Sequence, residues 1–187
     1  MMILKYIPNA LTIMRLILIL PFLTSLYQHA FAPAFYIFLT AGCTDALDGW
    51  IARSFKWQSA FGSFIDPLAD KFLIVSSFVS LAYLEELPWW LVSLVFMRDI
   101  TIFMGILVWF WFVQRKLNFE PTFLSKINTV LQLTLITLCM FKLSFLNHPI
   151  QGLELLILLT AITTSASYLD YFYTWGKKTH NAIQFAK

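Results

Sequence analysis

Four aspartates lie close together in an otherwise very apolar part of the chain. They form two pairs, Asp45 with Asp48 and Asp66 with Asp70. Carboxylate oxygens are preferred ligands of hard cations such as Mg²⁺ and Mn²⁺, and two such ions can clamp the attacking and leaving oxygens of a phosphoryl group. Four acids this close repel one another unless cations neutralise them. The pattern therefore predicts a divalent-cation site for phosphoryl chemistry.

The spacing of the acids places them on helix faces. If residues 45–53 are helical, two acids, two small residues and one cation share one face. They are Asp45, Asp48, Gly49, Ala52 and Arg53. The next segment repeats the arrangement with Gly62, Asp66, Ala69 and Asp70. Two facing helices of this kind would bring all four acids together.

The other residues on these faces suit a nucleotide or a pyrophosphate. Gly49, Ala52 and Gly62 leave room for close approach to the helix backbones, and Arg53 can neutralise a phosphate. Asp70 can deprotonate an attacking hydroxyl if it is not consumed as a metal ligand. Glycines on membrane helices are more often packing residues, so Gly49 and Gly62 can also be helix contacts.

The composition indicates that membrane-spanning helices position this site. Of the 187 residues, 59% are hydrophobic and 12% are charged, whereas soluble domains have about 25% charged residues. An acid inside a bilayer costs on the order of 3 kcal/mol, and two nearby cations, Arg53 and Lys71, cannot neutralise four acids as structural ion pairs. We therefore expect an all-α integral membrane protein with a functional acidic cluster.

We predict one domain, residues 1–187, with six transmembrane helices. The apolar runs are residues 11–27, 35–51, 61–84, 89–113, 123–145 and 153–175. Pro21 predicts a kink, and the Gly-Lys-Lys sequence at 176–178 is expected to end the last helix. Pro67 leaves two alternatives, because either Asp66 caps a helix that begins at the proline or the helix opens locally there.

The distribution of lysine and arginine predicts the orientation. Eight cations flank alternate connections and both ends: Lys5, Arg53, Lys56, Arg115, Lys116, Lys126, Lys177 and Lys178. The opposite turns have only Lys142 nearby. The positive-inside rule then places both termini and the acidic cluster on the cytoplasmic side. Since no transit peptide precedes the first span, we expect a bacterial inner membrane.

The acidic stretch resembles the signature of the CDP-alcohol phosphatidyltransferases, Asp-x-x-Asp-Gly-x-x-Ala-Arg, eight residues, then Gly-x-x-x-Asp-x-x-x-Asp. The resemblance implies a six-span homodimer in which a hydroxyl of the acceptor displaces CMP from CDP-diacylglycerol. It implies that Asp45, Asp48 and Asp66 hold two divalent ions, Mg²⁺ or Mn²⁺. Asp70 would contact a metal and act as the base. The CDP-diacylglycerol pocket would be lined by Gly49, Ala52, Arg53 and Gly62.

Weaker similarities concern the acceptor. The segment from Ser125 to Gln132 resembles Ser-Lys-x-Asn-Thr-x-x-Gln of eukaryotic-type cardiolipin synthases. Residues 8–15 resemble the start of the wider subgroup that makes phosphatidylglycerophosphate and cardiolipin. Phosphatidylglycerophosphate synthases typically have Gly-Lys-x-Lys-Thr at this segment. The likeness implies phosphatidylglycerol as acceptor and cardiolipin as product, with glycerol-3-phosphate as the alternative. A cation transporter is a remote third reading, since it would need acids near the bilayer midplane. We expect no nucleic acid partner.

Five residues are candidates for binding the acceptor or a lipid phosphate: Arg98, Ser125, Lys126, Asn128 and Gln132. Ser125, Thr129 and Gln132 share one helix face, which suits hydroxyl and phosphodiester contacts, although hydrogen bonds between helices would use the same pattern. Adjacent residues on a helix point apart, so Asp99 is expected to be a poor partner for Arg98. We expect Arg98 to bind a lipid phosphate or to pair with an aspartate of the acidic cluster instead.

Overall fold

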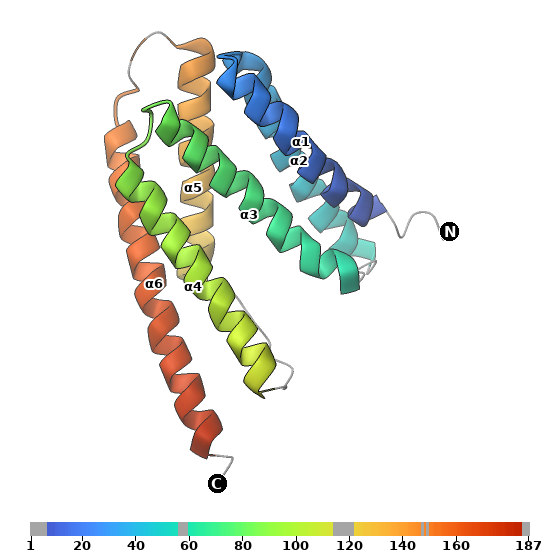
Figure 1. Cartoon of the computed structure of the whole chain (residues 1–187), viewed down its shortest axis with the longest axis vertical. Helices are drawn as coiled ribbons and strands as arrows, with labels where there is room; N and C mark the ends of the chain where they lie inside the picture. Colours follow the sequence, from blue (N-terminus) through green and yellow to red (C-terminus); the bar gives the residue numbers. More distant parts are fainter. Residues whose placement is uncertain (1–6, 56–59, 114–121, 147, 149, 185–187) are drawn as a thin grey trace. The chain divides into compact units, whose positions relative to one another are not determined.

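The computed structural model describes residues 7–55, 60–113, 122–146, 148 and 150–184. Side chains are described over 12–44, 69–105, 122–146 and 150–171, together with His148 and Tyr173. The described residues form six helices and no strand (Figure 1): α1 (Ile7–Tyr27), α2 (Phe31–Phe55), α3 (Ala60–Tyr83), α4 (Trp89–Val113), α5 (Phe123–Phe145) and α6 (Leu153–Gln184). The all-α prediction is confirmed for this part of the chain.

The predicted end of the last helix is wrong, and one of the two alternatives for Pro67 is excluded. Helix α6 continues through Gly176 to Gln184, because one glycine inside a helix costs only about 1 kcal/mol relative to alanine and the following lysines favour helix. Helix α3 begins at Ala60, so Pro67 is not its first residue and Asp66 is not its cap. Helix α1 runs without a break through Pro21, and whether it kinks there stays a prediction.

The turns after α1 and α3 share one backbone arrangement, in which a residue other than glycine adopts a positive φ. His29 follows α1 with a φ of 58°, and Glu85 follows α3 with a φ of 62°. The His29 N–H donates to the Leu26 carbonyl at 3.0 Å, and the Ala30 N–H donates to the Ser25 carbonyl at 2.9 Å. An equivalent pair of bonds closes α3. The last carbonyls of both helices are thereby satisfied.

The chain divides into two compact units, and the first contains α1, α2, α3 and the end of α5. Within this unit α1 contacts both α2 and α3. The core is apolar, and Phe22 and Phe38 pack with their ring centroids 6.0 Å apart. The ammonium nitrogen of Lys142, on the last turn of α5, lies 2.7 Å from a carboxylate oxygen of Glu86. This ion pair ties α5 to the turn after α3.

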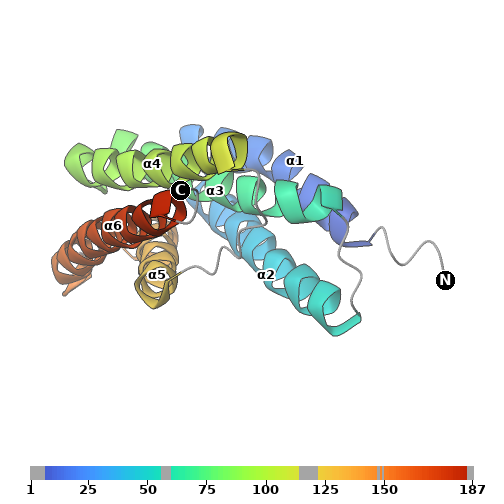
Figure 2. The same cartoon turned by 90° about the horizontal axis from the view of Figure 1, so that it is seen from below.

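The second unit contains α4, the first part of α5 and α6. Helices α4 and α6 run side by side in this unit, as Figures 1 and 2 show. A Cβ atom added to Gly105 on α4 would lie 1.8 Å from the hydroxyl oxygen of Tyr171 on α6. The Tyr171 side chain therefore lies against the Gly105 backbone, and a larger residue at position 105 would displace it.

Two described stretches are long and apolar enough to cross a membrane, Phe123–Phe145 and Leu153–Tyr171. Large apolar side chains on them are exposed, for example Val130 at 62% and Ile162 at 62%. Exposed apolar side chains of this kind suit contact with lipid. Both features fit an integral membrane protein. The number of spans, the side on which the termini lie and the single domain stay predictions.

Candidate functional site

Helices α2 and α3 carry the acidic cluster. The backbone of α2 includes Asp45, Asp48, Gly49, Ala52 and Arg53, and that of α3 includes Gly62, Asp66 and Asp70. Because both segments are helical, each set shares one helix face, as the spacing predicts. Of these eight residues, only Asp70 has a side chain within the described part of the structure. The other seven side chains lie outside it, and their predicted roles stay predictions.

Asp70 is held by an arginine of α1. Arg15 Nη1 donates to Asp70 Oδ1 across 55 positions of sequence. The Arg15 side chain is completely buried, whereas that of Asp70 is 38% exposed. A buried guanidinium needs an anionic partner to compensate for lost hydration, and the carboxylate provides it. Asp70 therefore has one oxygen bound to a fixed cation and part of its surface accessible.

The burial pattern of α1 explains why Arg15 points inward. Thr12, Arg15, Phe22 and Leu26 are all at most 1% exposed. Their spacing of three, seven and four residues is that of one helix face. On α3, Ala69 beside Asp70 is also completely buried. Arg15 therefore lies on the buried face of α1, the face that packs in the core of the first unit, and from there it reaches Asp70 on α3.

The chemistry of the acidic cluster fits divalent ions. Four carboxylates on two helices supply only hard oxygen donors, which suits Mg²⁺ and Mn²⁺. Among the described residues no group of three His, Cys, Asp or Glu side chains forms a metal-binding cluster. Three of the four acids lie outside that search, so the metal site stays a prediction.

Arg98 on α4 joins three helices of the second unit. Its Nη1 lies 2.7 Å from Asp99 Oδ1, and its Nη2 donates to Ser125 Oγ at 2.6 Å and to Ser167 Oγ at 2.8 Å. The prediction that Asp99 would be a poor partner is wrong. A long guanidinium side chain can bend back along the helix, so adjacent positions do not prevent the contact.

Three of the predicted acceptor residues take part in packing within the second unit. Ser125 binds Arg98, and Asn128 Oδ1 accepts hydrogen bonds from Thr163 at 3.1 Å and Thr164 at 2.8 Å. Gln132 is completely buried, and neither of its amide atoms has a hydrogen-bond partner among the described residues. Hydrogen bonds between helices therefore account for Ser125 and Asn128. An acceptor role for these residues and for the exposed Lys126 stays a prediction.

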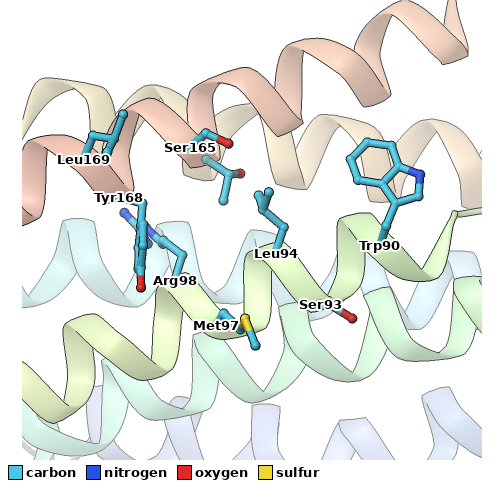
Figure 3. Close-up of a pocket in the computed structure, with 9 residues that line it drawn as sticks. Trp90, Ser93, Leu94, Met97, Arg98, Ser165, Tyr168 and Leu169 are labelled. Atoms are coloured by element: carbon cyan, nitrogen blue, oxygen red, sulfur yellow. The ribbon is translucent and has the colours of Figure 1, made fainter.

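Arg98 also lines a cavity of about 510 Å³ between α4 and α6 (Figure 3). The other lining residues are Trp90, Ser93, Leu94, Met97, Thr164, Ser165, Tyr168 and Leu169. In Figure 3, Arg98 and Tyr168 lie beside each other at one end, and Trp90 lies at the other. Arg98 is 3% exposed, and no described residue accepts a hydrogen bond from its Nε. A mostly apolar cavity with a few polar groups is typical of small-molecule binding sites.

Sequence reasoning found the acids but gave Arg15 no role. Arg15 lies in the stretch 8–15, which carries only a subgroup likeness, although a cation within an apolar stretch is itself a signal of a buried partner. Ser167 was likewise not predicted to bind Arg98. Both partners come from helices distant in sequence, so no local spacing indicates them.

Comparison with known proteins adds a second kind of evidence. Residues 5–168 match the model of the family described as CDP-alcohol phosphatidyltransferase. The chain is 38% identical to the Drosophila melanogaster protein named "Probable cardiolipin synthase (CMP-forming)", over 88% of this chain and 56% of that protein. It is 35% identical to the Homo sapiens cardiolipin synthase (CMP-forming), over 95% of this chain and 64% of that protein.

A relative with a different name is about as similar. The chain is 36% identical to the Mycobacterium tuberculosis protein named "Probable phosphatidylglycerophosphate synthase", over 83% of this chain and 76% of that protein. The chain thus spans between about half and two thirds of the length of the fly and human relatives, and about three quarters of the mycobacterial one.

Proposed function

The chain belongs to the CDP-alcohol phosphatidyltransferase family, and on this premise we propose that it transfers the phosphatidyl group of CDP-diacylglycerol to a hydroxyl of phosphatidylglycerol. Cardiolipin and CMP would be the products. The observation that carries the proposal is the acidic cluster on α2 and α3, in which Asp70 is held by the buried Arg15 and keeps an accessible surface.

The reaction assigns a role to each residue of the cluster. The acceptor hydroxyl attacks the phosphorus that carries diacylglycerol, the bond from that phosphorus to the bridging oxygen breaks, and CMP leaves. Asp70 takes the proton of the attacking hydroxyl. Gly49, Ala52 and Gly62 leave space for the nucleotide and diphosphate, and Arg53 neutralises a phosphate.

The four aspartates, Asp45, Asp48, Asp66 and Asp70, would hold two divalent ions, Mg²⁺ or Mn²⁺. Such ions, when bound, polarise a phosphoryl group and stabilise the charge on its oxygens. The protein would be a homodimer of six-span chains in a bacterial inner membrane, with both termini and the site facing the cytoplasm. The apolar composition and the two long apolar helices support the membrane part of this proposal.

The choice of phosphatidylglycerol rests on charge. Glycerol-3-phosphate carries a phosphate monoester, which favours several unpaired cations, whereas phosphatidylglycerol carries a phosphodiester with one charge. In the second unit the Arg98 guanidinium is already paired with Asp99, and Asn128 is neutral. Relatives named cardiolipin synthase in fly and human support the same choice. Because the mycobacterial relative is named a probable phosphatidylglycerophosphate synthase, glycerol-3-phosphate is the second candidate for the acceptor.

The acceptor can be tested with purified protein in detergent micelles. CDP-diacylglycerol and Mg²⁺ are supplied with phosphatidylglycerol, with glycerol-3-phosphate or with neither, and CMP release and the lipid product are measured. We expect CMP and cardiolipin only with phosphatidylglycerol. If CMP is released with glycerol-3-phosphate and not with phosphatidylglycerol, the cardiolipin proposal is wrong and glycerol-3-phosphate is the acceptor.

A further inference from the structure

A completely buried arginine touches the residue that the proposed reaction uses as its base. Arg15 Nη1 donates to Asp70 Oδ1, and both residues belong to the first unit. The other ion pair described in this unit is less enclosed, since the side chains of Lys142 and Glu86 are 26% and 14% exposed. Arg15 is therefore the more rigidly enclosed cation of the two.

The shape of the arginine side chain suits orientation of a carboxylate. A guanidinium is planar and donates in fixed directions, whereas an ammonium is a compact charge with rotatable donors. Arg15 is packed on a buried face of α1 with Thr12 and Phe22, so packing limits its movement. A carboxylate bonded to such a donor loses much of its rotational freedom.

We propose that Arg15 is a positioning residue, which fixes the Asp70 carboxylate so that its accessible part meets the acceptor hydroxyl. The inference rests on the proposed function, because it requires Asp70 to take that proton. It follows from the contrast between the two partners, since the cation is completely buried and the carboxylate is 38% exposed. Arg15 itself need not touch either substrate.

A purely structural ion pair would have a different signature. Loss of a structural pair lowers the amount of folded protein, and each folded molecule keeps its turnover number. Loss of orientation lowers kcat of the folded protein and leaves donor binding intact, because a displacement of about 1 Å can cost about 100-fold in rate. A measurement of kcat corrected for the folded fraction therefore distinguishes a positioning role of Arg15 from a purely structural one.

The test compares Arg15→Lys and Arg15→Met with wild type. We expect Arg15→Lys to lower kcat about tenfold and Arg15→Met to lower it about 100-fold, with KM for CDP-diacylglycerol changed by less than about twofold. The increase in Tm on addition of CDP-diacylglycerol with Mg²⁺ should persist. Lys142→Met is the matched control, since it breaks a second ion pair of this unit, the one with Glu86, and it should lower Tm without lowering kcat.

Turnover is divided by the folded fraction of each preparation, and Arg15→Lys decides the result if Arg15→Met does not fold. Wild-type kcat in Arg15→Lys would overturn the positioning role. The variant Asp70→Asn separates this inference from the proposed function. Wild-type turnover in Asp70→Asn would remove Asp70 as the base, whereas loss of turnover in Asp70→Asn with full activity in Arg15→Lys would overturn only the inference about Arg15.

Discussion

Gln132 is a completely buried amide, and in the part of the chain that the structure describes neither its oxygen nor its nitrogen has a hydrogen-bond partner. An unsatisfied buried polar group costs about 1–3 kcal/mol. We therefore expect Gln132→Met, which keeps a similar volume, to raise Tm in detergent. If Gln132 also meets the acceptor, as its predicted role requires, the same variant raises KM for phosphatidylglycerol.

The control for this variant is Leu135→Met, since Leu135 is completely buried in the same unit and has no polar group. A volume-conserving swap of this kind usually changes stability by less than about 1.5 kcal/mol. A lower Tm for Gln132→Met than for Leu135→Met would show that the amide has a partner, which contradicts the account of this residue.

The sequence predicts which residues share a helix face better than it predicts which side chains form contacts. The acids and small residues of the cluster follow from spacing alone, because helix periodicity places them on shared faces. The contact of Arg15 with Asp70 does not, since 55 residues separate them and helix packing brings them together. The pairing of Arg98 with Asp99 was missed because backbone direction does not limit a long flexible side chain.

Between helices α4 and α6, Gly105 leaves room for the Tyr171 side chain. A methyl group at this position would overlap the Tyr171 hydroxyl oxygen, 1.8 Å from the added Cβ, so α4 or Tyr171 must move. We expect Gly105→Ala to destabilise the protein by about 1–3 kcal/mol, since overpacking forces such shifts. Thermal unfolding in detergent measures the change.

Gly42 on α2 is the matched control, because a Cβ added there has nothing within 4 Å. Gly42→Ala should raise stability by up to about 1 kcal/mol through higher helix propensity. Equal Tm changes for the two variants would contradict a packing role for Gly105.

Most helix boundaries were predictable because charged and proline-containing turns interrupt long apolar runs. The α4 and α5 bounds agree with the predicted runs at both ends. The end of α6 was not predictable from Gly176, since helix propensity changes only slightly there and the following residues tolerate helix. The small unfavourable helix propensity of one glycine is outweighed by the favourable propensities of the residues around it.

In the molecule as a whole, the four aspartates of the acidic cluster come from two helices of one compact unit. Helices α2 and α3 both contact α1, which also supplies Arg15. The composition alone predicted the membrane environment, because so few charges cannot cover a soluble surface. The division into two compact units carries no sequence signal, since α5 passes from one unit to the other without a break.

The dependence of CMP release on divalent cations tests the central claim most directly. Wild-type protein is given CDP-diacylglycerol and phosphatidylglycerol after exhaustive treatment with EDTA, and Mg²⁺ or Mn²⁺ is then added back. We expect CMP release to stop in EDTA and to return with either cation, because four carboxylates alone cannot stabilise a phosphoryl group. Undiminished CMP release in EDTA would contradict the proposed role of divalent ions.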